Sequence, residues 1–458
     1  MAGINNLFEL SKRALLAYQG AMNTVGHNVA NAQTPGYSRQ RVDLRQSGVQ
    51  EGRWYLGLGV RLEGVERLRD RFLETQILEQ TARWGRFSRE RALLERLEGL
   101  FLPRTEGGLE AAFERFWNAW NDLAAQPDSL AVRGEVREAA RALVHLFHSQ
   151  DRYLQTLGEQ ALQEARQKVD RVNELLGQIA RINQQEHTNR LQGVVDNTLL
   201  DERDRLVREL AGLVELTAQT DPRTGMLVLF SGGLALVQGE KAETLEFDAD
   251  PARATFSLRL RNAQVAFRPA HGELGGLREF LQDTLPELRA RLDTLAGELV
   301  AAVNTLHMGG FTLDGQTGIA FFDPSGTTAA TIELDSAVQG DVSRIAAADR
   351  PDEPGNNAVA RAIAGLRLQR WLDSGLAAPG EFLSSLYGLV GSRSQQARAR
   401  ADAQQAILDH LQTLGEAISG VSLDEEMTHL IRFQQAYGAA ARVLQTVQEM
   451  VETLLSLK

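Results

Sequence analysis

The sequence of 458 residues contains no cysteine. This absence excludes disulfide bonds, thiolate metal sites and a cysteine nucleophile. It also suits a chain that is exported unfolded, because such a chain cannot be trapped by cross-links. Lysine is nearly absent too: it occurs only at positions 12, 168, 241 and 458, and arginine supplies the other basic residues.

Long apolar runs and an excess of positive charge are also missing. No stretch of 18 or more apolar residues occurs, so the sequence predicts no membrane insertion. The formal charge of −11 argues against nucleic acid as a partner, because binding phosphates needs a basic surface. The first residues lack the basic and apolar pattern of a secretory signal. The length allows about two to four domains.

The chain does contain a heptad pattern at each end. Steps of four and three residues at the N-terminus follow Ile4, Phe8, Ser11, Leu15, Tyr18, Met22, Val25 and Val29. The same steps at the C-terminus follow Leu423, Met427, Leu430, Gln434, Tyr437, Ala441, Leu444, Gln448, Val451 and Leu455. These patterns predict coiled-coil helices that pair with each other or with neighbouring subunits. Gln434 and Gln448 either fix the register of the helices or leave the seam partly hydrated. A polymer subunit needs such ends, whereas an enzyme rarely does.

The segments between the two heptad patterns differ in their predicted secondary structure. The first helix, from about residue 4 to 30, is expected to end near Thr34-Pro35-Gly36, because Pro-Gly favours a turn. An extended, glycine-rich segment follows to residue 68, then helices to about residue 210 with breaks near 102–103, 126–128 and 193. Short strand-like runs occupy 226–230, 234–237, 244–247 and 255–260. A long helix at about 276–307 and a loop-rich stretch at 323–355 precede further helices.

We therefore predict an α+β fold, a mainly helical elongated rod with paired N- and C-terminal coiled-coil helices and an inserted β-rich domain in the middle. The predicted division is 1–65, the N-terminal half of an inner coiled-coil domain with its extended linker; 66–210, the first part of a helical domain; 211–335, a β-rich domain with a long helix leading back; 336–415, the second part of the helical domain; and 416–458, the C-terminal helix of the inner domain.

A search for chemistry finds no catalytic constellation, metal site or cofactor site. His145 and His148 lie on one helix face, but no third ligand is suggested nearby, so packing is the favoured interpretation. Asp201 and Asp204 are interpreted as a solvated or salt-bridged helix face rather than an acid–base pair. The run at 314–318 lacks the ligand spacing of a calcium loop and is interpreted as a turn.

Two terminal runs carry a family resemblance. NVANAQTPGYSRQ at 28–40 and ISGVSLDEEMTHLIRFQQAYGAAARVL at 418–444 resemble the terminal signatures of bacterial flagellar axial proteins, the rod, hook and hook-associated proteins. Interior runs narrow the resemblance to the hook-associated protein 1 family at the hook–filament junction: NTLLDERD at 197–204, GELGGL at 272–277, VNTLHMGG at 303–310, DGQTGIAFF at 314–322 and GNNAVA at 355–360. Many relatives have a larger outer domain where this chain has only residues 323–355, so we expect that lobe to be missing.

The resemblance implies a non-enzymatic structural subunit of the bacterial flagellum. It implies export by the flagellar type III apparatus, a transient cytoplasmic stage, and a final extracellular location at the hook–filament junction. The implied partners are copies of the chain in the axial tube, hook protein, hook-associated protein 3, and a cytoplasmic export chaperone on the C-terminal helix. The alternatives are another axial protein, and a secreted enzyme or adhesin that borrows axial termini for export.

The candidate site residues fall into two groups. The residues expected to pack the terminal helices during assembly are Phe8, Leu15, Tyr18, Met22, Val25, Leu423, Met427, Leu430, Tyr437, Leu444 and Val451. The signature turn, expected to join the inner helix to the next layer, consists of Asn31, Thr34, Pro35, Gly36 and Tyr37.

Overall fold

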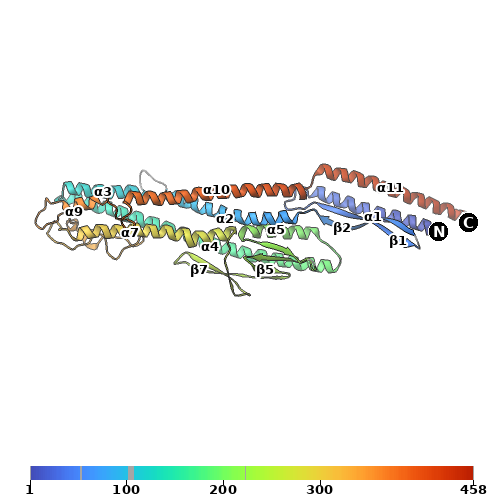
Figure 1. The fold of residues 1–458 in the computed structure, drawn as a ribbon, viewed down its shortest axis with the longest axis horizontal. Helices are drawn as coiled ribbons and strands as arrows, with labels where there is room; N and C mark the ends of the chain where they lie inside the picture. Colours follow the sequence, from blue (N-terminus) through green and yellow to red (C-terminus); the bar gives the residue numbers. More distant parts are fainter. Residues whose placement is uncertain (1, 52–53, 102–107, 222, 457–458) are drawn as a thin grey trace. The chain divides into compact units, whose positions relative to one another are not determined.

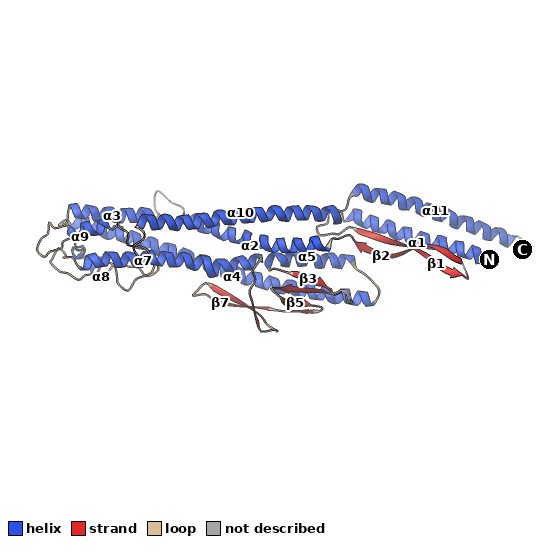
Figure 2. Cartoon of the chain, viewed as in Figure 1, coloured by secondary structure: helices blue, strands red, loops and turns tan. Residues whose placement is uncertain are grey.

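The computed structural model describes residues 2–51, 54–101, 108–221 and 223–456. The chain packs as two compact units. Unit 1 contains Met1–Arg83, Val172–Thr244 and Gln405–Lys458, and unit 2 contains Trp84–Arg171 and Leu245–Gln404. The described fold is α+β and mostly helical, as predicted (Figures 1 and 2).

The predicted elements at the two ends are confirmed. Helix α1 (Ala2–Ala30) ends just before the signature turn, and strands β1 (Gln40–Glu51) and β2 (Trp54–Arg67) form an antiparallel hairpin in the predicted extended segment. The C-terminal helices are α10 (Pro379–Ser419) and α11 (Leu423–Ser456), with the expected break between them.

The helices observed between residues 71 and 213 also agree with the sequence prediction. They are α2 (Arg71–Phe101), α3 (Leu109–Ala125), α4 (Leu130–Leu191) and α5 (Asn197–Leu213). The predicted breaks near 126–128 and 193 separate α3 from α4 and α4 from α5. The predicted break at 102–103 lies outside the described residues. Local sequence explains two helix starts: Asp70 accepts hydrogen bonds from Phe72 N and Leu73 N, and Asp196 caps α5 in the same way.

The strands form small antiparallel sheets. In unit 1, β3 (Thr217–Thr220), β4 (Leu227–Ser231), β5 (Leu234–Gln238) and β6 (Lys241–Ala242) pair in sequence order. In unit 2, β7 (Leu245–Asp250), β8 (Thr255–Leu260) and β9 (Val265–Phe267) do the same. The four predicted strand runs correspond to β4, β5, β7 and β8. The sequence did not predict β3, β6 and β9, which are short edge strands.

The predicted long helix begins at Gly272 rather than near 276, and a π-helical turn interrupts it. It consists of α6 (Gly272–Glu279), the π turn (Phe280–Thr284) and α7 (Leu285–Met308). A glycine is required at 276, because a Cβ there would lie 2.7 Å from the carbonyl oxygen of Arg86 on α2. The remaining elements of unit 2 are α8 (Ser336–Gly340), a 3₁₀ turn (Val342–Arg344) and α9 (Ala358–Gly365).

Aromatic residues form the core of unit 2. Helix α3 buries Phe113, Phe116, Trp117 and Trp120, which pack against Phe147, Phe321 and Phe322. Helix α7 fixes the Phe-Phe segment through Asn304. Its amide group donates to Phe322 O (2.8 Å) and accepts from the backbone N–H groups of both phenylalanines (2.9 Å each). The interior runs at 303–310 and 314–322 are therefore two halves of one buried contact.

His307 belongs to this core and is fully buried. Its Nδ1 lies 2.8 Å from Ile319 O, and the N–H of Ala346 donates to its Nε2 at 2.8 Å. Nε2 accepts only when it carries no proton, so the ring is neutral. Burial lowers the pKa of His307 to about 4, against the ordinary value of 6.5, and the nearby Arg133 guanidinium contributes.

We predict that unit 2 loses stability as the pH falls from about 6.5 to about 4. In this window the unfolded state binds a proton at residue 307 and the folded state does not, so the free energy of unfolding falls with pH by up to about 3 kcal/mol. Urea unfolding at several pH values measures this. His307→Gln should reduce the slope, whereas His145→Gln, at an exposed position on α4, should not. Equal slopes for the wild type and His307→Gln would contradict the assignment.

Candidate functional site

The terminal helices of unit 1 pair with each other. Helices α1 and α11 pack along their lengths and run antiparallel, so both chain ends lie at the same end of this pair (Figure 1). Helix α1 also packs on the β1–β2 hairpin. The first of the two expected arrangements, pairing within one chain, is thus present in the structure.

The buried face of α1 consists mainly of small residues. The buried side chains are Ser11, Ala14, Ala17, Ala21, Thr24, Val25 and Asn28. Small side chains allow α1 to approach its neighbours closely: a Cβ at Gly20 would lie 2.8 Å from the Leu62 side chain on β2. Ala21, Val25 and Phe433 form the buried centre, with Tyr18 and Met22 at its edge. The Tyr18 and Phe433 ring centroids are 6.4 Å apart.

Helix α11 faces α1 with a stripe that differs from the predicted one. Glu426, Phe433 and Val447 are buried, and Leu430, Tyr437 and Leu444 are half-buried. The last three belong to the predicted seam. The other predicted positions, Leu423, Met427 and Val451, remain 51%, 48% and 38% exposed.

On α1, the predicted Val25 is buried, Leu15, Tyr18 and Met22 are half-buried, and Phe8 is 40% exposed. Part of the predicted seam therefore lies in this contact: Val25 is in its centre, and Tyr18, Met22 and Leu430 pack against it. The closest contact also uses the alanines of α1. The exposed seam residues stay a prediction about contacts with neighbouring subunits.

The signature turn is built by local hydrogen bonds. Asn31 Nδ2 donates to His27 O (3.0 Å), and the Thr34 hydroxyl donates to Asn31 Oδ1 (3.2 Å). Gly36 has a φ of +82°, which favours glycine. Pro35 and Gly36 are exposed, whereas Tyr37 turns back towards α1. These contacts reverse the chain between α1 and β1.

Asn28 is the polar centre of the site and is only 1% exposed. Its Oδ1 accepts from the Tyr37 hydroxyl (2.7 Å) and from Gln40 N (3.0 Å). Its Nδ2 donates to Gln40 O (2.8 Å) and to Glu426 Oε2 (2.9 Å). All four hydrogen bonds available to an amide side chain are made. One side chain thus ties α1, the turn, β1 and α11 together.

Glu426 and Arg39 complete this polar cluster. Arg39 Nε donates to Glu426 Oε1 at 2.7 Å, and Arg39 Nη1 to Glu425 Oε2 at 2.6 Å. Burial raises the pKa of the Tyr37 phenol, and the charges of Asp201 and Glu426 raise it further, so the hydroxyl remains a donor. Sequence analysis did not single out Asn28, Arg39 or Glu426. One signal in the sequence could have found two of them: Asn28 and Glu426 each occupy a position that continues an apolar stripe of their helix.

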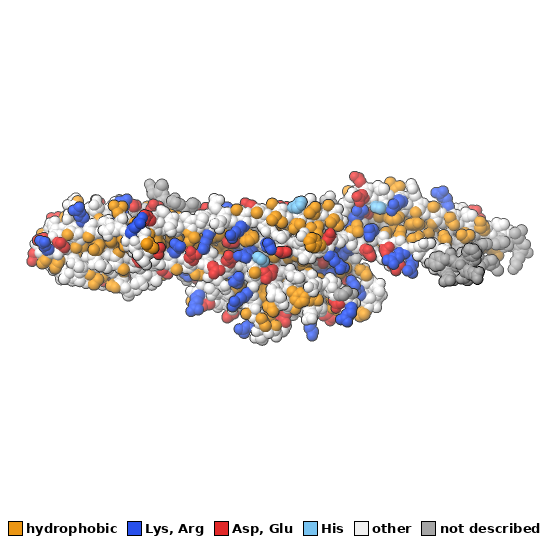
Figure 3. Space-filling model, in the orientation of Figure 1, with side chains coloured by type: hydrophobic (Ala, Val, Ile, Leu, Met, Phe, Trp, Pro, Cys, Tyr) orange, Lys and Arg blue, Asp and Glu red, His pale blue; other side chains and the backbone are white. Residues whose placement is uncertain are grey.

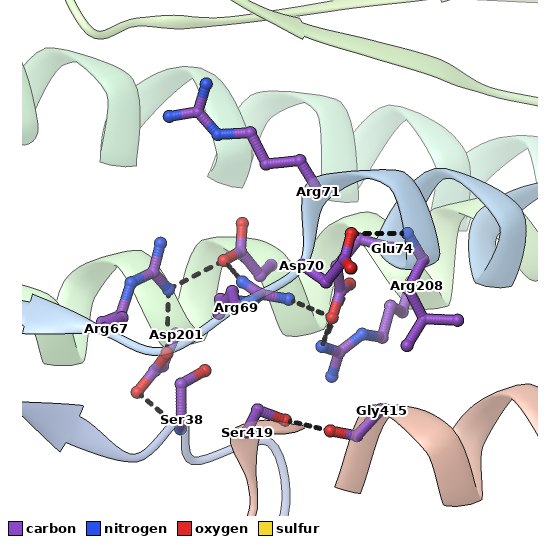
Figure 4. A network of polar contacts seen from close by, with 12 residues as sticks. Ser38, Arg67, Arg69, Asp70, Arg71, Glu74, Asp201, Arg208, Gly415 and Ser419 are labelled. Carbon is purple, nitrogen blue, oxygen red and sulfur yellow. Dashed lines mark hydrogen bonds and ion pairs between the residues drawn. The ribbon is translucent and has the colours of Figure 1, made fainter. Parts of the chain in front are cut away.

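A second polar network holds the chain on either side of the β hairpin (Figure 4). The backbone N–H of Ser38 donates to Asp201 Oδ2 at 3.2 Å, and Arg67 Nη1 pairs with both Asp201 and Asp204 at 2.8 Å. Asp201 and Asp204 are therefore salt-bridged residues of α5, as predicted. They fix the beginning and the end of the hairpin to one helix.

The network continues to the start of α2. Arg69 pairs with Asp204 and, at 2.7 Å, with Glu74, and Arg208 pairs with Glu74 at 3.0 Å. Burial alone would raise the pKa of Glu74, but Arg69 and Arg208 outweigh it and hold that pKa below its ordinary value. Ion pairs of Arg69 with Asp204 and Glu74 thus fix the linker between β2 and α2.

The histidine pair shows ordinary structural contacts. His148 Nε2 lies 2.9 Å from Ile332 O, and His145 is exposed. In the described part of the chain, no group of three or more His, Asp or Glu side chains could hold a metal ion. Within the same residues, no helix is both long and apolar enough to cross a membrane.

Replacing Asn28 with alanine is expected to weaken the attachment of α11 to α1. The change removes the partner of Glu426 Oε2 and the side-chain partner of the Gln40 backbone, while Arg39 still pairs with Glu426 Oε1, and costs about 3 kcal/mol. Hydrogen exchange of the full chain should show faster exchange along both helices. Asn31→Ala removes only a local contact at the turn and should change exchange little beyond the turn. Equal effects of both variants would show that the buried amide is not the attachment point.

Known proteins resemble the chain over most of its length. A family model described as "Flagellar hook-associated protein FlgK helical domain" matches residues 94–322, half of the chain. A second model, "Flagellar basal body rod FlgEFG protein C-terminal", matches residues 417–457.

Two curated relatives are both called Flagellar hook-associated protein 1. The Bacillus subtilis protein is 26% identical over 98% of this chain and 97% of the relative, and the Escherichia coli protein is 24% identical over 99% and 100%. The alignment with the Escherichia coli protein runs over 551 residues, so that relative has residues that this chain lacks.

A solved structure shares the fold. The flagellar hook junction protein FlgK from Burkholderia pseudomallei matches with a TM-score of 0.68 at 14% identity, over 75% of this chain and 100% of that chain. Together with the match to half of the chain, these likenesses identify the family. The chain belongs to the family of flagellar hook-associated proteins that carry the FlgK helical domain.

Proposed function

We propose that the chain is a non-catalytic structural subunit of the bacterial flagellum that forms the junction zone between hook and filament. The observation that carries this proposal is the family match to half of the chain, together with relatives called Flagellar hook-associated protein 1 that align over nearly their whole length. The paired terminal helices support it, because a self-assembling tube needs a packing element in every subunit.

The exposed side of α11 offers a surface for that packing. Leu423, Met427 and Ile431 are each about half exposed, and Leu455 is 69% exposed. Figure 3 shows hydrophobic side chains at the surface of α11. Single exposed apolar residues are ordinary, but a row along one helix marks an interaction site. We propose that the apolar stripe of α11 packs against neighbouring subunits, while the stripe around Phe433 holds α1.

The proposed partners follow from this position. They are copies of the chain in the axial tube, hook protein on one side and hook-associated protein 3 on the other. Before export through the type III apparatus, a cytoplasmic chaperone would cover the exposed stripe of α11, which is otherwise an aggregation hazard. The final location would be the extracellular hook–filament junction. The division at residues 65, 210, 335 and 415 stays a proposal about domains.

Deleting residues 423–458 should abolish incorporation into flagella and binding of the chaperone, while the remaining chain keeps its helical middle. The deletion removes both the contact with α1 and the exposed stripe. Electron microscopy of cells that carry only the truncated gene, and circular dichroism of the purified protein, measure the two effects. Filaments of normal number and length on those cells would refute the proposed role.

Met427→Asp separates assembly from folding. Its side chain is exposed in the single chain, so the free energy of unfolding should change by no more than about 0.5 kcal/mol. Burying a carboxylate between subunits is costly, so incorporation into flagella should fall strongly. Ala439→Asp adds the same charge at an exposed position of α11 outside both stripes and should assemble normally. If both variants assemble equally well, the stripe does not contact neighbours.

A further inference from the structure

Unit 1 contains a cavity of about 950 Å³ beside the salt-bridge network of Figure 4. A cavity of this size is at the upper end of those that bury drug-sized ligands. Seven arginines and five acidic residues line it: Arg45, Arg67, Arg69, Arg71, Arg190, Arg203 and Arg208, with Asp43, Glu63, Glu66, Glu74 and Asp204. The lining side chains carry two more positive than negative charges, and Asp201 and Glu186, just outside the lining, pair with Arg67 and Arg190.

Most of these arginines already have carboxylate partners. Asp204 forms ion pairs with Arg67 and Arg69, and Glu74 forms ion pairs with Arg69 and Arg208. Arg190 pairs with Glu186 at 2.6 Å. In Figure 4 the Arg71 side chain points away from this network, and it also lines the cavity.

Arg203 on α5 differs from its neighbours. It is 5% exposed, yet its Nε and Nη1 atoms have no hydrogen-bond partner among the described residues. Asp204 Oδ1 is 3.7 Å from Nε, too far for a hydrogen bond. A buried guanidinium with unused donors is costly unless a ligand satisfies it. Burial lowers the pKa of Arg203 to about 10, and Arg67 contributes, so the group stays charged at neutral pH.

The lining also includes apolar side chains. Leu78, Leu200, Val207 and Leu227 stand in the wall together with the charged groups. A bare inorganic anion would use only the guanidinium groups. A peptide that carries a carboxylate would use both kinds of surface, and the planar guanidinium fork fits a carboxylate with two parallel hydrogen bonds.

We propose that this cavity binds an acidic segment of a second copy of the chain, with Arg203 as the group that receives a carboxylate. The occupant is inferred from charge complementarity: Arg203 is a buried positive charge with unused donors, and a neighbouring copy is acidic overall. The identification of the occupant as a second copy rests on the proposed function, since only assembly brings copies together.

A photo-crosslinking experiment on the full chain in flagella tests the occupant. We place p-benzoylphenylalanine at Thr75, which is exposed and lines the cavity, and in a control at Phe72, which is 73% exposed and does not line it. The expected result is a cross-link from position 75 to an acidic segment of another copy, absent from position 72. Cross-links from position 75 only to a different protein, or none at all, would overturn the proposal.

A binding experiment on the purified full chain tests Arg203 itself. The probe is the peptide acetyl-Glu-Glu-Glu-amide at low salt, with inorganic phosphate in a parallel titration. Arg203→Met should raise the Kd of the peptide at least about tenfold. It should leave Tm unchanged or higher, because an unpartnered buried charge is removed. Arg205→Met, an exposed residue of α5 outside the cavity, should change neither.

Each other outcome refutes the proposal. A peptide that does not bind the wild type, or binds Arg203→Met equally well, excludes this role for Arg203. Phosphate binding as tight as peptide binding would indicate a simple anion site instead. If the wild-type chain enters flagella but these tests fail, only this inference falls; if the wild-type chain never enters flagella, the proposed function falls.

Discussion

The buried hydrogen bond between Asn28 and Glu426 is the interaction on which unit 1 depends. It joins residues 398 positions apart and lies where the helix pair meets the signature turn. The amide and the carboxylate are both removed from water, so losing either leaves a buried polar atom of the other without its partner. The ends of the chain are therefore coupled to each other by chemistry and not only by apolar contact.

This coupling explains why so much of the signature run serves the inside of the subunit. Tyr37, Arg39 and Gln40 all direct polar groups at Asn28 or Glu426. Ser38 reaches in the other direction, to Asp201 on α5. A run of neighbouring residues thus connects the terminal helices to the helices that follow the hairpin. The apolar stripe of α11 remains exposed because the attachment to α1 uses a different face.

Unit 2 shows the same principle with other side chains. Asn304 and His307 are buried polar residues of α7 that hold backbone groups of distant segments. Both belong to runs that resemble the family, and both act by satisfying carbonyl and N–H groups of a segment without regular secondary structure. In both units, buried polar side chains specify which segments meet, and the surrounding apolar residues supply most of the stabilisation.

The sequence by itself determined the order of the long helices and of the main strands, because helical periodicity and Pro-Gly turns act locally. It also determined the family resemblance, and it left open whether Asp201 and Asp204 are solvated or salt-bridged. It did not determine which face of α1 and α11 would pair. Large apolar residues at 4–3 spacing defined one stripe, and the contact uses part of it together with the neighbouring alanines at 14, 17 and 21.

Only the tertiary structure decided the roles of Asn28, Glu426 and Arg203. In the sequence each is an ordinary polar residue. The partners of Asn28 and Glu426 lie 9 to 398 positions away, and the proposal for Arg203 rests on two donor atoms without a hydrogen-bond partner. The free energy of burying a polar group depends on what surrounds it in three dimensions, which no local pattern contains.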